Sequence, residues 1–173
     1  MPTPISHAAV DFAIGSWTAP SRPSLRVCVA AAACAALPDI DVLWSSGLPA
    51  SSPFAHRALT HSLLFALVGA TVIAAVFFSS DRWRPTRTPI AGVLLLALLS
   101  HSCLDSLSTY SLGIGFLVPF SEHRFRFPWR PLGRPTGTIM SQLVEEAIVV
   151  FLPAVLLGWL AWRARADHSR PPR

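Results

Sequence analysis

Several histidines and aspartates stand at the ends of apolar stretches, where ionisable side chains are costly. An ionisable group at membrane depth costs about a few kcal/mol unless it is paired, hydrated or bound to a metal, so each is a candidate for function. Imidazoles mixed with carboxylates suit Zn²⁺, and Mn²⁺ or Fe²⁺ also fit this ligand set. The sequence therefore predicts a divalent metal site built from His7, Asp39, Asp41, His56, His61, His101 and Asp105.

His101 and Asp105 are four residues apart in an apolar segment. On a helix, this spacing places both side chains on one face, about 6 Å apart along the axis, which suits two ligands of one ion. The same spacing also fits a histidine hydrogen-bonded to the carboxylate one turn away. This pair alone is compatible with both interpretations.

Asp39 and Asp41 follow Pro38, which disfavours helix at Leu37 and predicts a bend. An extended Asp39-Ile40-Asp41 segment would send both carboxylates to the same side and Ile40 to the other. Carboxylates placed in this way repel each other unless a cation lies between them. A solvated helix end is the alternative interpretation of the pair.

His56 and His61 are five residues apart, which does not align them on one helix face, so we expect His56 in the loop that enters the helix. Thr60 could cap a helix that begins at His61. Alternatively, Ser52 caps a helix with Pro53 at its first position. The planar guanidinium of Arg57 suits a carboxylate partner or a bound substrate phosphate.

The elements that must position these groups are hydrophobic helices. Hydrophobic residues make up 52% of the 173 residues and charged residues 13%, with a mean hydropathy of +0.50, whereas soluble domains carry about 25% charged residues. We expect an all-α, polytopic membrane bundle formed as one domain over residues 1–166, with a polar cytoplasmic tail over 167–173. Four hydrophobic helices are expected near 25–44, 61–78, 89–104 and 143–162, with a weaker fifth from Ile5 to about Ser16. The Pro- and Gly-containing segment 106–142 predicts a long loop before the last helix.

Antiparallel helices would bring all the His/Asp clusters to one membrane face, although they are scattered over a hundred residues. Arginine near membrane helices is retained preferentially in the cytoplasm. Nine of the fourteen basic residues, all of them arginine, fall on the opposite face, which predicts a multi-pass protein of the inner (plasma) membrane with an extracytoplasmic site. Those nine are Arg22, Arg26, Arg82, Arg84, Arg87, Arg163, Arg165, Arg170 and Arg173; the opposing evidence is Arg124, Arg126, Arg130 and Arg134.

Several other features have simpler interpretations. The arginines cluster between apolar runs and form no single basic stripe, so we expect no nucleic-acid binding. Arg22 and Arg26 before the Ala-rich run 27–36 raise the alternative of a cleaved signal peptide, which would discard His7. We do not expect one, because the cationic region would be unusually long and three further apolar helices would remain. The alternating aromatic and basic residues of 120–127 predict anchoring at the membrane interface. Glu145 and Glu146 are expected to open the last helix as partners of its dipole, or as an extra ligand or base. Cys28, Cys34 and Cys103 show no disulfide spacing and are expected to be small buried residues.

These clusters resemble the YdjM family, also called DUF457, which is described as a family of membrane-bound metal-dependent hydrolases. The resemblance extends over about residues 1–130 and rests on a set of short motifs: Ser6-His7, Leu37-Pro38-Asp39-Ile40-Asp41, His56-Arg57-Ala58-Leu59-Thr60-His61-Ser62, His101-Ser102-Cys103-Leu104-Asp105 and Pro119-Phe120-Ser121. More distantly, the order of histidines and aspartates is similar to that of zinc-dependent phospholipase C and P1-type nucleases. That similarity implies hydrolysis of a phosphoester, which could belong to a lipid or to a small molecule.

The resemblance and the residues together predict a metal-dependent hydrolase in the lipid bilayer. The bound metal would activate water, Asp41 or Asp39 would act as general base, and Arg57 would hold the anionic substrate. A non-enzymatic alternative is a membrane scaffold whose metal-bound or salt-bridged cluster locks the helices together. A proton or ion carrier is less compatible, because runs 64–78 and 89–99 have almost no polar residues at the midplane.

Overall fold

The computed structural model describes residues 3–18, 24–109, 112–133 and 138–167, and its regular elements are helices. Within these ranges β-structure is limited to two isolated bridges, Ser108 with Leu132 and Ile114 with Phe125. The all-α expectation is therefore confirmed. In chain order the elements are α1 (Pro4–Thr18), α2 (Leu25–Cys34), η1 (Pro38–Leu43), η2 (Leu59–His61), α3 (Leu63–Phe77), η3 (Asp81–Thr86), α4 (Arg87–Ser106), α5 (Ile139–Glu146), η4 (Ala147–Phe151) and α6 (Leu152–Asp167).

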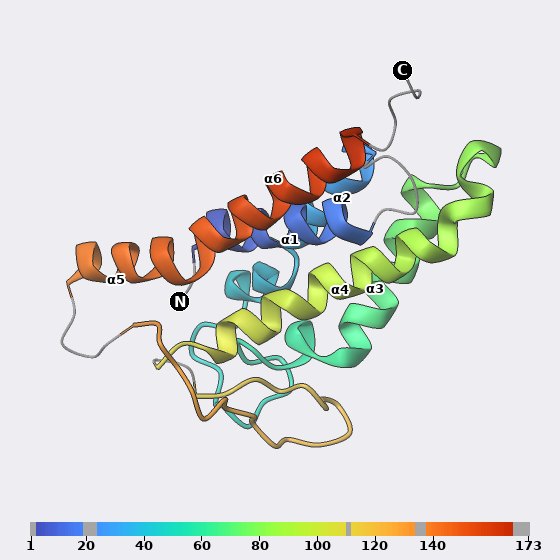
Figure 1. Ribbon diagram of the computed structural model, residues 1–173. Coiled ribbons are helices and arrows are strands. Elements are labelled where there is room, and N and C mark those ends of the chain that lie inside the picture. Colours follow the sequence, from blue (N-terminus) through green and yellow to red (C-terminus); the bar gives the residue numbers. More distant parts are fainter. Residues whose placement is uncertain (1–2, 19–23, 110–111, 134–137, 168–173) are drawn as a thin grey trace.

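The helices run back and forth, so that chain reversals gather at two ends of the bundle (Figure 1). α1 packs against α2, α4 and α6, and α3 packs against α4. α5, the π-helical η4 and α6 follow one another as a single long rod beside α1 (Figure 1). One end of the bundle carries η1, η2 and the long loop, whereas the η3 turn lies at the other end.

The core between α2, α3 and α4 combines small and large side chains. Ala66, Ala70 and Ala74 form the buried stripe of α3, at the four-residue spacing that places them on one helix face. They pack in the same cluster as the buried Leu94 and Leu98 of α4. Small residues allow helices in a membrane to approach closely, so van der Waals contact can replace the hydrophobic effect that lipid does not supply.

The outer surface of α3 and α6 is apolar and exposed. On α3, Val72 and Val76 are 53% and 61% exposed, and on α6 Leu156 and Trp159 are 55% and 51% exposed. A soluble domain would bury such residues, whereas hydrocarbon solvates them. By length and composition, two helices could cross a membrane, Asp81–Ser106 and Ile139–Ala164, and Leu63–Phe77 is a shorter apolar helix.

The expected helix over 25–44 was too long. α2 ends at Cys34, and a turn leads into the 3₁₀-helix η1, with Pro38 at its first position. Proline has no amide hydrogen and its ring clashes with the preceding turn, so it disfavours the continuation of an α-helix. The chain bends at Leu37 as expected, although the φ and ψ angles of this residue stay in the right-handed helical region. α2 therefore falls short of a full membrane span.

Three smaller expectations were also wrong. Ser62, and neither Thr60 nor Ser52, caps α3 by accepting a hydrogen bond from the Phe65 amide at 3.1 Å. Glu145 and Glu146 close α5, which begins earlier at Ile139. Cys103 is exposed on α4, whereas Cys28 and Cys34 are buried as expected.

The loop expected over 106–142 is confirmed over the described residues 107–109 and 112–133, which contain no helix, but it ends earlier than expected because α5 begins at Ile139. Arg22, Arg134, Arg170 and Arg173, used above for orientation, lie outside the described residues, as does most of the expected tail, 168–173.

Candidate metal centre

α4 carries two site residues on its buried face. His101 and Asp105 lie one turn apart and are both fully buried. Neither ring nitrogen of His101 has a hydrogen-bond partner among the described residues. The alternative in which His101 is simply hydrogen-bonded to Asp105 is therefore not what the structure shows.

η1 brings Asp39 and Asp41 close to His101 and Asp105, but its backbone conformation differs from the expected one. The segment is a 3₁₀-helix and not an extended strand. Asp41 is buried, and its Oδ2 accepts hydrogen bonds from the Thr60 hydroxyl at 2.6 Å and the Arg57 amide at 3.1 Å. Its Oδ1 lies 2.7 Å from Nδ1 of His56. Both oxygens of Asp41 are thus already engaged by neighbouring residues.

His56 and Arg57 come from the turns before η2, as expected for an entering loop. Arg57 has a left-handed backbone, with φ of 65°, which is uncommon for a non-glycine residue. Its carbonyl accepts hydrogen bonds from the Gly115 amide and the Arg124 guanidinium, both at 2.9 Å. Its side chain donates from Nε to Oδ2 of Asp105 at 2.8 Å, so a buried ion pair joins this turn to α4.

His61 ends η2 and is fully buried against α4. The hydroxyl of Ser102 donates to the His61 carbonyl at 2.9 Å, which fixes η2 on α4. Nδ1 of His61 lies 3.5 Å from Oδ2 of Asp41, and its Nε2 faces Asp39 and Asp105. His61 therefore occupies the middle of the cluster.

His7 reaches the site from α1. Its ring stacks on that of His101, with centroids 4.0 Å apart and planes inclined by 22°. Nε2 of His7 lies 3.6 Å from Oδ1 of Asp105. The structure thus brings together all seven residues from which the sequence predicts a metal site, and they come from α1, η1, the turn before η2, η2 and α4.

Unpartnered polar atoms test whether these residues fit a metal ion. Among the described residues, several buried atoms of the cluster make no hydrogen bond: Nδ1 and Nε2 of His7, Oδ1 of Asp39, Nε2 of His61, both ring nitrogens of His101 and Oδ1 of Asp105. Each buried polar group left without a partner costs about 1–3 kcal/mol. A bound metal ion would account for so many unpartnered atoms in one place, because coordination bonds would replace the missing hydrogen bonds.

The spacing of possible ligand atoms in the cluster is close to that around an ion. Nε2 of His61 and Nε2 of His101 each lie 3.5 Å from Oδ1 of Asp39, and Nε2 of His61 lies 3.7 Å from Oδ2 of Asp105. Tetrahedral zinc with bonds of 2.0–2.2 Å has ligand atoms about 3.3–3.6 Å apart. One ligand atom from each of Asp39, His61, His101 and Asp105 lies within 4.8 Å of the others. These four residues fit a metal ion best.

A second group, Asp39, Asp41 and His56, meets the same distance criterion but lies nearer the surface. The side chains of His56 and Asp39 are 31% and 27% exposed, whereas that of Asp41 is 1% exposed. The site is therefore buried on its α4 side and reaches solvent at His56 and Asp39.

The electrostatics of η1 favour charged carboxylates. Partial burial raises the pKa of Asp39, but the His101 and His61 imidazoles lower it further, to well below its usual range. Burial likewise raises the pKa of Asp41, and its contacts with His56, His61 and Thr60 outweigh that effect, so the net shift is also downward. Both side chains are thus ready anionic groups for a cation.

Asp11 is a buried acid that sequence reasoning missed. It lies on α1 one turn after His7, is fully buried, and its Oδ1 accepts a hydrogen bond of 2.5 Å from the Ser100 hydroxyl of α4. Its i, i+4 spacing from His7 on an apolar helix was the available signal. Glu146, considered above as an extra ligand, instead accepts hydrogen bonds from the amide and hydroxyl of Thr3, at 2.5 and 2.6 Å.

Comparison with known proteins agrees with this architecture. The sequence pattern described as YdjM inner membrane protein matches residues 1–167. The inner membrane protein YbcI of Escherichia coli (strain K12) is 38% identical over 175 residues, which cover 95% of this chain and all of that protein. The uncharacterized protein YvsG of Bacillus subtilis (strain 168) is 38% identical over 100 residues, 58% of this chain and 54% of that protein. No solved structure matches significantly. With nearly the whole chain matched, the protein belongs to the YdjM family of inner membrane proteins.

Proposed function

We propose that this protein is a multi-pass, metal-dependent hydrolase of the inner membrane that acts on a phosphoester. The observation that carries the proposal is the set of buried ligand atoms without hydrogen-bond partners on Asp39, His61 and His101, at separations suited to one ion and with a carboxylate oxygen of Asp105 beside them. A purely structural cluster would be expected to satisfy these atoms by hydrogen bonds within the protein.

Each residue has a distinct role in this proposal. Asp39, His61, His101 and Asp105 hold the ion, and His7 stacks on His101 and faces the remaining oxygen of Asp105. A divalent cation bound there supplies a water of lowered pKa and polarises a phosphoryl oxygen; zinc fits the ligand set best, with manganese or iron as alternatives.

His56 is the proton acceptor in this proposal, with Asp41 behind it. Both oxygens of Asp41 already accept hydrogen bonds from neighbouring residues. Asp41 therefore acts as a positioning residue for His56 and does not itself take the proton. Because Asp41 holds Nδ1 of His56 by a hydrogen bond, Nε2 of His56 remains to accept the proton of the attacking water. A bond from phosphorus to the water oxygen then forms, the bond to the leaving alcohol breaks, and the proton passes to the departing oxygen.

The proposed orientation is supported by the arginines of the η3 end and opposed by Arg124, Arg126 and Arg130 in the long loop of the metal-site end. The metal-site end carries η1, η2 and the long loop, and the opposite end carries the arginines of η3. Arginine is preferentially retained in the cytoplasm, so the proposed site faces the extracytoplasmic side.

Metal analysis and hydrolysis assays test the proposal on purified full-length protein. The His101→Ala and Asp105→Ala variants should lose bound metal and metal-dependent hydrolysis of model phosphodiesters and phospholipids. His123→Ala and Asp81→Ala are matched controls, because these residues are exposed outside the site, and both should behave as wild type. Unchanged metal content in the site variants would remove these residues from the ligand set. Metal-loaded protein with no turnover on a broad substrate panel would favour a structural scaffold instead.

A further inference from the structure

A polar cavity of about 330 Å³ opens beside His56, between the turns of 45–57 and the segment 112–124. Its lining includes Ser45, His56, Arg57 and Arg124, and no carboxylate is among the residues that line it. Binding sites for small ligands typically begin at about 300 Å³. The cavity is therefore large enough for a compact group, and its charged lining is cationic.

Arg57 lines this cavity and has unused hydrogen-bonding capacity. The residue is 6% exposed, its Nε donates to Asp105, and its Nη2 has no acceptor among the described residues. A guanidinium can bind a phosphate through two parallel N–H groups. A buried donor without an acceptor is unfavourable in the free protein, and an anionic ligand would supply the missing acceptor.

Arg124 adds a second positive charge that is held by uncharged acceptors. Its Nη1 donates to the carbonyls of His56 and Arg57, at 3.1 and 2.9 Å, and its Nη2 donates to the carbonyl of Ala50 at 2.7 Å. Burial and the positive charge of Arg57 lower the pKa of Arg124. Two neighbouring cations of this kind favour a bound anion, which would relieve their mutual repulsion.

The larger cavities described in the structure have the opposite character. One of about 630 Å³ lies between α1, α4 and α6, and another of about 390 Å³ lies between α2 and α3. Both have almost wholly apolar linings, and neither is lined by any of the seven predicted ligands. Only the cavity beside His56 combines contact with the metal cluster and positive charge among those described.

We propose that this cavity binds the phosphate of a compact, polar phosphoester, held by Arg57 and Arg124 next to His56. This inference rests on the proposed function, because it assigns the substrate of the same site. The recognised chemistry is the phosphate itself, either on a free small molecule or on a lipid headgroup. The acyl chains of a lipid substrate would lie outside this cavity.

Phosphate binding tests the proposal without measuring hydrolysis. Full-length protein in phosphatidylcholine nanodiscs is titrated calorimetrically with inorganic phosphate, once with zinc and once after chelation. We expect binding in both states, and a loss of affinity of about tenfold to a hundredfold in Arg57→Lys, since a charge-assisted hydrogen bond is worth about 1.5–3 kcal/mol. Arg124→Lys should also weaken binding. Arg126→Met is the matched control, because Arg126 is exposed and does not line the cavity.

Leu112→Trp fills the cavity without removing a charge, and Leu112 is 63% exposed, so this variant should fold normally. It should lose phosphate binding like Arg57→Lys. Phosphate affinity unchanged in both variants, or absent in the wild type, would overturn the proposal. If the protein hydrolyses substrate but phosphate affinity is the same in these variants as in the wild type, the cavity assignment alone fails. If phosphate binds as expected but metal-loaded protein hydrolyses nothing, the proposed function alone fails.

Competition identifies the source of the phosphate. Glycerol 3-phosphate that displaces inorganic phosphate points to a free small molecule. Nanodiscs in which phosphatidic acid replaces part of the phosphatidylcholine, and in which inorganic phosphate no longer binds, point to a lipid headgroup. Either result supports the cavity as the phosphate site. Displacement by neither would contradict recognition of a phosphoester.

Discussion

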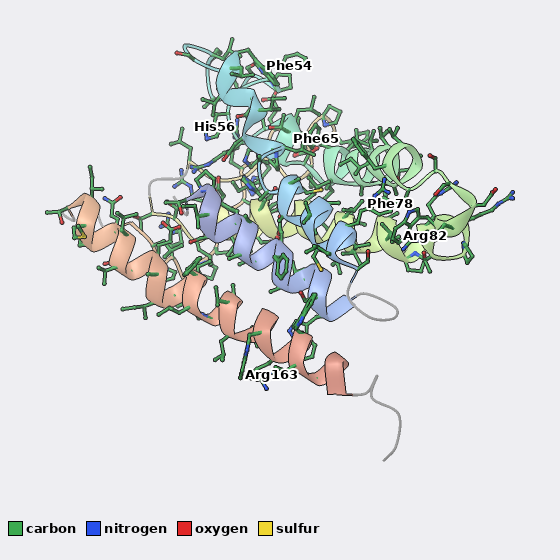
Figure 2. All side chains as sticks on the ribbon, turned by 90° about the horizontal axis from the view of Figure 1, so that it is seen from above. Phe54, His56, Phe65, Phe78, Arg82 and Arg163 are labelled. Carbon is green, nitrogen blue, oxygen red and sulfur yellow. The ribbon has the colours of Figure 1, made fainter. Side chains whose placement is uncertain are left out.

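The polar side chains at the two ends of the bundle differ in how their hydrogen bonds are satisfied. At the η3 end, Arg26 donates to the Phe77 carbonyl at 2.6 Å and lies over the rings of Phe78 and Trp83. Arg87 donates to the carbonyls of Phe78 and Ser79. At the other end, ring nitrogens of His7, His61 and His101 and one oxygen each of Asp39 and Asp105 are buried without hydrogen-bond partners in the part of the chain that the structure describes. Figure 2 shows the two ends, with Arg82 far from His56.

The contrast separates anchoring from binding. A polar group with partners inside the protein needs no ligand, so the arginines at the η3 end are accounted for by carbonyls and aromatic rings. A buried polar group without a partner is unfavourable unless something else completes it. Ionisable side chains near a membrane surface can therefore differ in function, and their hydrogen bonds distinguish them.

The largest effect should come from removing ligands. In the double variant Asp39→Ala/His61→Ala, metal affinity should fall by more than about a hundredfold, beyond the 10–100-fold typical of residues that only support ligands. Elemental analysis and competition with a chelator measure it. Asp81→Ala, at the η3 end, should retain its metal. An equal loss of metal affinity in the double variant and in Asp81→Ala would contradict the proposed difference between the two ends.

A smaller effect is expected from Asp41→Asn. This variant preserves shape but weakens the charge-assisted contact with Nδ1 of His56, so we expect metal affinity or turnover to fall about 10–100-fold. Titration with metal and steady-state kinetics measure the two effects. A decrease as large as that of the double ligand variant would instead make Asp41 a ligand in its own right.

Ser100→Ala should cause a moderate loss of stability. It removes the hydroxyl that donates to the buried Asp11, and hydrogen bonds between membrane helices contribute about 0.6–2 kcal/mol. Denaturant unfolding in detergent measures the change. Ser79→Ala at the η3 end, an exposed site, is the control and should be neutral. No difference between the two would mean that Asp11 has no stabilising contact with α4.

Arg26→Met should have the smallest effect. Arg26 is exposed, and its contacts with a carbonyl and two rings are worth about 0.5–1 kcal/mol. We expect a small fall in unfolding temperature with unchanged metal content. Loss of metal from this variant would show that the two ends are coupled, contrary to the division drawn here.

Sequence reasoning was most successful where patterns repeat along one element. The long apolar runs predicted helices, and the proline-rich stretch predicted the loop before α5. It was least successful at element ends. The expected helix over 25–44 ran past Pro38, although that proline was itself expected to disfavour helix at Leu37, and α2 ends at Cys34. The expected cap at Thr60 left out the competing carboxylate of Asp41, to which the Thr60 hydroxyl donates.

The residue types by themselves determined that this chain belongs with membrane helices and carries side chains of the kinds that can bind a metal, because hydrophobicity and ligand character are properties of single side chains. Only the tertiary structure decided which atoms remain without partners. It paired Arg57 with Asp105 and Asp41 with His56, and it left Nε2 of His61 and of His101 facing Asp39. Hydrogen bonding depends on distances of a few tenths of an ångström between residues up to a hundred positions apart, and spacing along a chain does not specify such distances.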